Sequence, residues 1–214
     1  MADLAADLAI GVIGAGGRMG TTVVQEVFET DGCVLVAAAE NAGHPAVGRD
    51  AGEVAGLGAL GVAIGEDAAS VFKRAKVVIE FALPEATARH VVIAGESGTA
   101  HVIGTTGFSA DQEAIIRKAG EAAPVVVAPN MSLAVNILFA LTKQVAGLLD
   151  DRFDIEIVEM HHKHKVDAPS GTALGLGRAA AAGRGVDLDA AAQMARHGHA
   201  GARRQGDIGF AVLR

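Results

Sequence analysis

A dense cluster of ionisable side chains stands at residues 159–173, which read EMHHKHKVDAPSGTA. Five consecutive positions in this stretch carry three histidines and two lysines, namely His161, His162, Lys163, His164 and Lys165. Side chains of these types can bind a metal ion, a nucleic acid or a small anion, or they can form a solvated charged surface.

A metal site is disfavoured, because the lysines interleaved with the histidines would repel a cation. Only His162 and His164 could share one face at strand spacing. A nucleic-acid patch is disfavoured by the net charge of −7 and by the absence of Trp and Tyr. We therefore expect no metal ion and no nucleic acid, which leaves a small anion or a solvated cluster.

The residues that follow the cluster favour the anion. Pro169 lies near the expected start of a helix, and Ser170 has the residue type of an N-cap. The amides of Gly171 and Thr172 would then be free first-turn donors at the positive end of the helix dipole. Together with Lys165 and the histidines, they would bind a small dicarboxylate, and one histidine is a candidate proton donor.

A glycine-rich turn, VIGAGGRMG, follows the first apolar run of the chain. The usual dinucleotide fingerprint would place a glycine at Met19, so the spacing that fits is the variant formed by Gly14, Gly17 and Gly20. Such a turn lets a pyrophosphate approach the backbone at the start of a helix. The alternative is a purely structural turn.

The end of the second apolar run bears on the choice of cofactor. Glu40 lies 20 residues after Gly20, where a carboxylate would bind ribose hydroxyls. It would also repel a 2′-phosphate, and Asn41 offers no positive charge to offset this. The sequence therefore leans slightly toward NADH over NADPH, although Arg18 could reach a phosphate.

The elements that must position these residues form two domains. Over residues 1–129, apolar runs alternate with helical stretches, which predicts a Rossmann-like parallel sheet covered on both faces. Over residues 130–214, the alternating pattern of FDIEIVEMHH, with Phe153, Ile155 and Ile157 on one face, predicts a half-buried strand of a smaller α+β domain with an open mixed sheet. The first domain would bind the dinucleotide, and the second would bind substrate and other subunits.

Individual elements follow from local signals. We expect strands at 9–14, 34–40, 77–81 and 125–130, and a strand with its loop at 101–107. Helices are expected at 19–30, from Pro84 to about residue 95, after a Ser109–Gln112 capping box, and from an N-cap at Ser132 to about residue 149. The GTTG loop at 104–107 lies at the carboxyl end of a strand, where it could position a nicotinamide ring or be an ordinary turn.

Composition places the chain in a broad class. Half of the 214 residues are hydrophobic and 20% are charged, as in a globular protein. The one cysteine, Cys33, excludes an internal disulfide. No secretory signal precedes Arg18, and no apolar run approaches the roughly 18–20 residues that cross a bilayer. We therefore expect a cytoplasmic protein.

Four stretches, GAGGRMG, GTTGFS, APNMSLAVN and above all EMHHKHKVDAPSGTA, resemble the 4-hydroxy-tetrahydrodipicolinate reductase family, also called dihydrodipicolinate reductase. The resemblance runs from about residue 10 to residue 214. It implies reduction of 4-hydroxy-tetrahydrodipicolinate to tetrahydrodipicolinate for diaminopimelate and lysine synthesis. It further implies NADH or NADPH as cofactor and a homotetramer built through the second domain.

The resemblance also implies a role for each matching residue. His161 would donate the proton, and Lys165 would stabilise charge on the substrate. The substrate carboxylates would be held by His162, Lys165, Gly171 and Thr172. The cofactor would be lined by Gly14, Ala15, Gly16, Gly17, Arg18, Met19, Glu40, Gly104, Thr105, Thr106, Ala128, Pro129, Asn130 and Met131.

This chain departs from the family pattern in two places. Residues 80–83 read EFAL where the family often has Asp-Phe-Thr-Arg, so we expect a basic side chain to be missing near the cofactor. Family members continue beyond the position of Arg214, so we expect an unpaired edge on strand 208–213 and loss of the tetramer. A dinucleotide-binding sensor or inactive fragment is therefore an alternative function, and another dehydrogenase on the same fold is a third.

Overall fold

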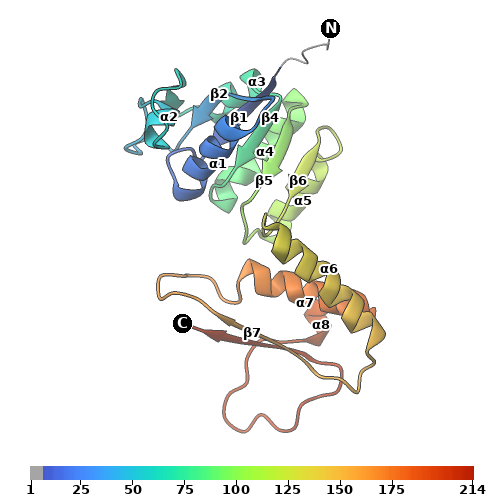
Figure 1. Cartoon of the computed structure of the whole chain (residues 1–214). Helices are drawn as coiled ribbons and strands as arrows, with labels where there is room; N and C mark the ends of the chain where they lie inside the picture. The colour runs from blue at the N-terminus through green and yellow to red at the C-terminus, as the bar shows by residue number, and fades with distance from the viewer. Residues whose placement is uncertain (1–6) are drawn as a thin grey trace. The chain divides into compact units, whose positions relative to one another are not determined.

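The structure is a computed structural model that describes residues 7–214. The chain divides into two compact units, Met1–Ala128 and Pro129–Arg214. Both units contain a sheet and helices (Figure 1).

The first unit contains a six-stranded sheet whose ladders are all parallel. The strand order is β3-β2-β1-β4-β5-β6, in which the direction of winding reverses between β1 and β4. This is the order of a doubly wound dinucleotide-binding sheet, whose ligands bind beyond the carboxyl ends of the strands at the reversal point. The strands are β1 (Leu8–Ile13), β2 (Cys33–Ala39), β3 (Ile64–Gly65), β4 (Val77–Glu80), β5 (Ala100–Ile103) and β6 (Val125–Val127).

Helices cover both faces of this sheet, as the sequence predicts. Val12 of β1 belongs to the same buried cluster as Val24 of α1, whereas the next residue, Ile13, belongs to a cluster with Val71 of α3. Successive side chains of a strand point to opposite faces, so α1 and α3 pack on opposite sides. The helices are α1 (Arg18–Glu29), α2 (Ala51–Val54), α3 (Ala68–Arg74), α4 (Pro84–Ser97) and α5 (Ala110–Ala119).

The predicted helix starts are confirmed in detail. Pro84 occupies the first turn of α4, where its missing N–H costs nothing. Ser109 and Gln112 form both bonds of a capping box at the start of α5. In the second unit, Ser132 caps α6 (Leu133–Leu148) by accepting a hydrogen bond from the amide of Val135.

The second unit contains a three-stranded sheet in the order β7-β9-β8. Its strands are β7 (Ile155–Met160), β8 (Ala192–Gln193) and β9 (Ile208–Leu213), and its other helices are α7 (Gly171–Arg184) and α8 (Leu188–Ala191). Residues of β7, α7 and β9, including Ile157, Ala180 and Phe210, share one buried cluster. Helix α6 runs beside α7 (Figure 1).

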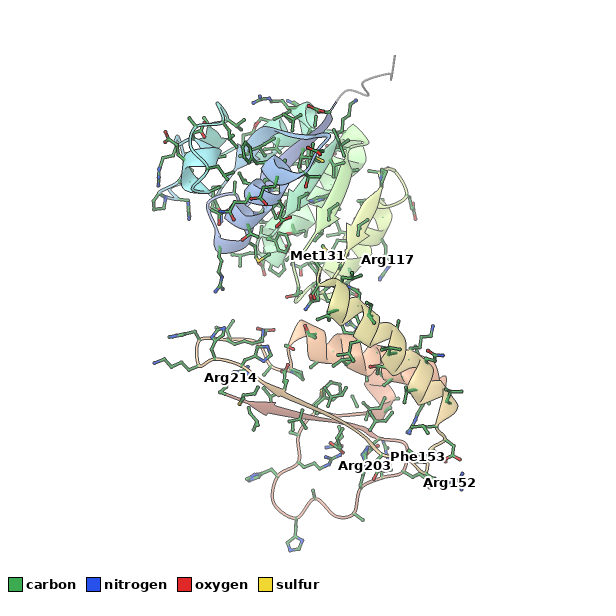
Figure 2. The ribbon with its side chains drawn as sticks, viewed as in Figure 1. Arg117, Met131, Arg152, Phe153, Arg203 and Arg214 are labelled. Carbon is green, nitrogen blue, oxygen red and sulfur yellow. The ribbon has the colours of Figure 1, made fainter. Side chains whose placement is uncertain are left out.

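This sheet differs from the prediction in three details. Its ladders are parallel rather than mixed, because crossovers through helices and a long loop return each strand in the same direction. Strand β9 is central: it pairs with β7 over all six residues and with β8 at Ile208 and Gly209, so its edge is partly covered. Phe153, expected on the strand's buried face, precedes β7 and is 50% exposed (Figure 2).

Helix α6 is the most apolar long helix of the second unit, yet Ala146 is its one buried residue. Its exposed large hydrophobic side chains are Leu133, Ile137, Leu138, Leu141, Val145 and Leu148. Among the helices described between residues 7 and 214, none has both the length and the apolar character that a membrane span requires.

Candidate active site

The glycine turn between β1 and α1 is built as the spacing predicts. Gly14 has φ +80, a backbone conformation that side chains disfavour, and its amide donates to the carbonyl of Ala39. A Cβ on Gly20 would lie 1.9 Å from the carbonyl oxygen of Gly14, so only glycine lets α1 pack this close to the turn. Gly17 is the N-cap of α1 and has no side chain to occupy the first-turn amides. These amides are therefore available to an anion.

The predicted cofactor residues of this turn form one continuous backbone segment. Ala15 is buried and Gly16 half-buried, whereas Arg18 and Met19 are exposed at the first turn of α1. The amide of Ala15 donates to the same Ala39 carbonyl as Gly14, which ties the turn to the end of β2.

A cavity of about 410 Å³ lies at the carboxyl ends of β1, β2 and β4, beside the reversal point of the sheet. Its lining includes two predicted cofactor residues, Gly14 and Glu40. The complete lining is Ile13, Gly14, Ala39, Glu40, Asn41, Ala42, Glu66, Ala68, Phe81, Ala82, Leu83, Arg89 and His90. The position matches the general rule for ligand sites in doubly wound sheets.

Two basic side chains in this lining bear on the expectation that a basic side chain is missing near the cofactor. The loop at 80–83 indeed carries no basic residue, but Arg89 and His90 of α4 reach the same cavity. These two residues could have been found from the sequence, because α4 follows β4 and therefore starts at the ligand-binding edge of the sheet.

The GTTG loop is tied to the loop that follows β4. The amide of Gly104 donates to the carbonyl of Glu80, and the hydroxyl of Thr105 donates to the carbonyl of Ala82 at 3.1 Å. Thr105 is buried, whereas Thr106 is exposed. At the end of the neighbouring β6, the amide of Ala128 donates to the carbonyl of Ile103.

Glu80 is a buried carboxylate in this unit that the sequence reasoning did not single out. Its side chain is fully buried and lies 2.8 Å from both His90 Nδ1 and His101 Nε2. Burial by itself would raise the pKa of Glu80, but hydrogen bonds from His101 and His90 outweigh it and hold that pKa below its ordinary value. Sequence reasoning missed it because the carboxylate and its two histidine partners come from three separate elements, β4, α4 and β5.

In the second unit, the histidine–lysine cluster forms a turn after β7. The amide of His161 donates to the carbonyl of Leu213, and the amide of Lys165 donates to the carbonyl of His162. His162, Lys163 and His164 are exposed, whereas His161 and Lys165 are partly buried. The two residues predicted to act on the substrate's reacting atoms are thus the two that pack against the protein.

Asp167 closes this turn. Its carboxylate lies 2.7 Å from the ammonium of Lys165, and its carbonyl accepts a hydrogen bond from Arg214 at the end of β9 (Figure 2). The hydrogen bond from Lys165 holds the pKa of Asp167 below its ordinary value. Lys165 is therefore held in place by a partner that the sequence reasoning did not name.

The start of α7 lies beside the end of β7. Glu159 accepts hydrogen bonds from both the amide and the hydroxyl of Ser170, while Ser170 caps the helix by accepting from the amide of Ala173. The Nδ1 atom of His161 lies 3.6 Å from Glu159 Oε2. Burial acts to raise the pKa of Glu159, but the Ser170 hydrogen bonds and the nearby His161 outweigh it, so that pKa is lowered.

Thr172 links this helix start to the loop before α6. Asn130 Nδ2 donates to Thr172 Oγ1 at 3.1 Å, and Asn130 Oδ1 accepts from the amide of Ser132 at 2.8 Å. A predicted cofactor residue therefore contacts a predicted substrate residue within the second unit. Gly171 and Thr172 are the first two residues of α7. The other predicted cofactor residues of this loop, Pro129 and Met131, are the sequence neighbours of Asn130.

A six-stranded parallel sheet with a glycine turn at its first strand–helix junction defines a protein with a Rossmann-like fold. Residues 8–131 match the sequence family described as "Dihydrodipicolinate reductase, N-terminus", and residues 134–214 match "Dihydrodipicolinate reductase, C-terminus". The chain belongs to the dihydrodipicolinate reductase family, an oxidoreductase family, as its resemblance implied.

Individual relatives agree with this assignment. Proteins named 4-hydroxy-tetrahydrodipicolinate reductase from Bradyrhizobium sp. (strain ORS 278) and Afipia carboxidovorans are 53% and 52% identical to it. These alignments cover 95% and 97% of this chain and 75% and 76% of the relatives. A solved structure, "Dipicolinate bound Dihydrodipicolinate reductase from Paenisporosarcina sp. TG-14", matches with a TM-score of 0.63 and 25% identity, covering 97% of this chain and 78% of that one.

Proposed function

We propose that this chain reduces 4-hydroxy-tetrahydrodipicolinate to tetrahydrodipicolinate with a pyridine nucleotide, a step in diaminopimelate and lysine synthesis. One observation carries the proposal: His161, the capped start of α7 and Thr172 gather in the second unit of a chain whose first unit holds a glycine turn. The relative named as binding dipicolinate supports a dicarboxylate ligand for this cluster.

The substrate carboxylates would be bound at the start of α7. Gly171 and Thr172 present first-turn amides at the positive end of the helix dipole. Lys165 would add positive charge, and the exposed imidazole of His162 would add a ring N–H donor, since its Nδ1 accepts from the amide of His164. Two carboxylates held this way fix the orientation of the ring between them.

His161 would supply the proton. A bound reduced nicotinamide would supply the hydride. Replacing the 4-hydroxyl by hydrogen takes up one hydride and one proton and releases one water, so a C–O bond breaks and a C–H bond forms. As negative charge develops on the substrate, His161 would donate the proton to the atom that carries it, and the ammonium of Lys165 would stabilise that developing charge. Glu159 stands 3.6 Å from His161 Nδ1, so its carboxylate places a negative charge beside the ring that would donate the proton.

The residues of the first unit fit a pyridine nucleotide, because a Cβ at Gly14 would collide with the Phe81 carbonyl and one at Gly20 with the Gly14 carbonyl, so glycines allow the tight turn that leaves the first amides of α1 uncapped. The cofactor would lie along Gly14 to Met19, Glu40, Gly104 to Thr106 and 128–131. The carboxylate of Glu40 would bind ribose hydroxyls and repel a 2′-phosphate. We therefore propose that NADH binds at least as well as NADPH.

We also propose a cytoplasmic location, where the pyridine nucleotide pool is available, and, in spite of the expected loss of the family's tetramer, a homo-oligomer. The unburied leucines and isoleucine of α6 support subunit contact through the second unit, because such apolar patches mark association surfaces. A size-exclusion measurement on the purified chain tests the oligomer.

The experiment that tests the activity is oxidation of NADH and NADPH by the purified chain in the presence of 4-hydroxy-tetrahydrodipicolinate. We expect turnover that requires this substrate. Binding of the dinucleotide without turnover would support a sensor or an inactive fragment instead, and turnover with unrelated substrates alone would support another dehydrogenase.

A further inference from the structure

A buried polar network underlies the cavity of the first unit. Glu80, the last residue of β4, has its carboxylate enclosed by three side chains. Its Oε1 accepts from the hydroxyl of Thr87 at 3.2 Å and lies 2.8 Å from His90 Nδ1, and its Oε2 lies 2.8 Å from His101 Nε2. A carboxylate removed from water is tolerated only where donors and positive charge compensate it.

His101 is the inner partner of this carboxylate. Its ring is fully buried with Phe72 at its edge, and its Nδ1 has no partner among the described residues. A second ring hydrogen would be buried without an acceptor, which is costly. The geometry therefore directs a ring hydrogen on Nε2 at Glu80.

His90 is the outer partner. Its side chain is 16% exposed and lines the cavity, so it lies between the buried carboxylate and a ligand in that cavity. Because Glu80 occupies Nδ1, Nε2 is the ring nitrogen left for a ligand. Arg89, the preceding residue, lines the same cavity.

The network has two arms. The contact of Glu80 with His90 is the His90 arm, and the Thr105 arm reaches the GTTG loop through two hydroxyls. Thr87 Oγ1 lies 2.9 Å from Thr105 Oγ1, which also donates to the carbonyl of Ala82. Each hydroxyl has one hydrogen to donate. When ionised Glu80 accepts a hydrogen bond from the Thr87 hydroxyl, the Thr87 oxygen can only accept from Thr105. The Thr105 hydroxyl then donates to both Thr87 Oγ1 and the carbonyl of Ala82. The charge on Glu80 thus sets the direction of both hydroxyls.

We propose that Glu80 is a positioning residue of the dinucleotide site, which holds His90 against the adenosine half of the cofactor and orients the Thr105 hydroxyl in the GTTG loop. The inference rests on the proposed function, since it takes the ligand to be a pyridine nucleotide. The adenosine half is assigned to this cavity because Gly14 and Glu40 line it.

The substitution Glu80→Gln keeps the shape of the side chain and changes the chemistry of both arms. The amide has no charge to pair with His90. It can also donate to Thr87, which would reverse the direction of the hydroxyl chain.

A double-mutant cycle measured by calorimetry with ADP-ribose tests the His90 arm. We expect Glu80→Gln and His90→Ala each to weaken ADP-ribose binding about tenfold, the effect of one charge-assisted hydrogen bond. Because Glu80 acts through His90, the double variant should bind no more weakly than His90→Ala alone. Unchanged binding in Glu80→Gln, or fully additive losses, would overturn the proposal.

The Thr105 arm is tested by Thr87→Val, which leaves the carboxylate of Glu80 in place. This variant keeps the proposal testable even if Glu80→Gln does not fold. We expect several-fold weaker NADH binding and unchanged ADP-ribose binding. The matched control is Thr99→Val, another buried threonine, whose hydroxyl bonds the carbonyl of Phe72 outside this network. Equal losses for both ligands, no loss, or the same loss in Thr99→Val would contradict this arm.

These results separate the inference from the proposed function. A wild-type chain that binds neither NADH nor ADP-ribose contradicts both. A wild-type chain that binds and turns over, but whose variants show no coupling between positions 80 and 90, contradicts the inference alone.

Discussion

Glu159 accepts two hydrogen bonds from Ser170, one from the backbone amide and one from the hydroxyl. The pair joins the end of β7, just before the histidine–lysine cluster, to the N-cap of α7. Since His161 follows Glu159 by two residues, this contact sets the position of the proposed proton donor relative to the proposed carboxylate site.

The first prediction concerns this pair. Glu159→Gln should lower kcat about tenfold or more, because it removes the negative charge beside His161 and replaces an acceptor with a donor facing Ser170. Steady-state kinetics with 4-hydroxy-tetrahydrodipicolinate measure the effect. Glu156→Gln is the matched control, since Glu156 lies on the same strand but pairs with Arg196 instead. Equal kcat values in the two variants would count against the role of Glu159.

The second prediction separates the two residues assigned to the chemistry. His161→Ala should lower kcat by about 10²–10⁴-fold, the usual range for a general acid, and leave NADH affinity nearly unchanged. Lys165→Ala should lower kcat and also raise KM, because the ammonium contacts the substrate in both the ground state and the transition state. Wild-type kcat/KM in either variant would show that the role given to that residue is wrong.

The third prediction concerns the glycine turn. Gly20→Ala places a methyl group 1.9 Å from the Gly14 carbonyl, so α1 must move away from the turn. NADH affinity should fall by at least about tenfold and the melting temperature should drop. Gly65→Ala is the control, since a Cβ there has only an ordinary contact at 3.9 Å. Similar NADH affinities for the two variants would refute the steric argument.

The fourth prediction follows from the lowered pKa of Glu80. A carboxyl whose pKa is lower in the folded state than its ordinary 4.5 stabilises the fold above that value, and this contribution is lost as pH falls through the folded pKa. The difference in unfolding free energy between wild type and Glu80→Gln should therefore shrink as pH decreases below about 4.5. Urea titrations at several pH values measure it. A difference that grows toward acid pH has the wrong sign for this account.

The fifth prediction concerns the cofactor. Glu40 beside Asn41 should let NADH bind at least as tightly as NADPH, even though Arg89 and His90 line the same cavity. Calorimetric titration of both cofactors decides the matter. NADPH binding more than about tenfold tighter, roughly 1.4 kcal/mol, would mean that these cations outweigh the repulsion from Glu40.

Local signals allowed much of the fold to be predicted. Capping residues such as Ser109, Ser132 and Ser170 mark helix starts through bonds to neighbours a few residues away, so their consequences can be worked out from sequence. The glycine spacing of the first turn was predictable for the same reason.

Other features depend on which distant elements meet, and sequence spacing does not carry that information. The triad of Glu80, His90 and His101 joins β4, α4 and β5. The parallel direction of β9 depends on how the chain returns after a long loop, and neither alternation nor composition reports it. The Glu159–Ser170 contact spans eleven residues and a turn, so two unremarkable polar residues became partners only in the structure.

The most direct test of the central claim is the rate of NADH oxidation by the purified chain with and without 4-hydroxy-tetrahydrodipicolinate, compared with His161→Ala under the same conditions. The account predicts substrate-dependent oxidation in the wild type and a loss of about 10²-fold or more in the variant. Oxidation that is absent in the wild type, or equal in the two proteins, would contradict it.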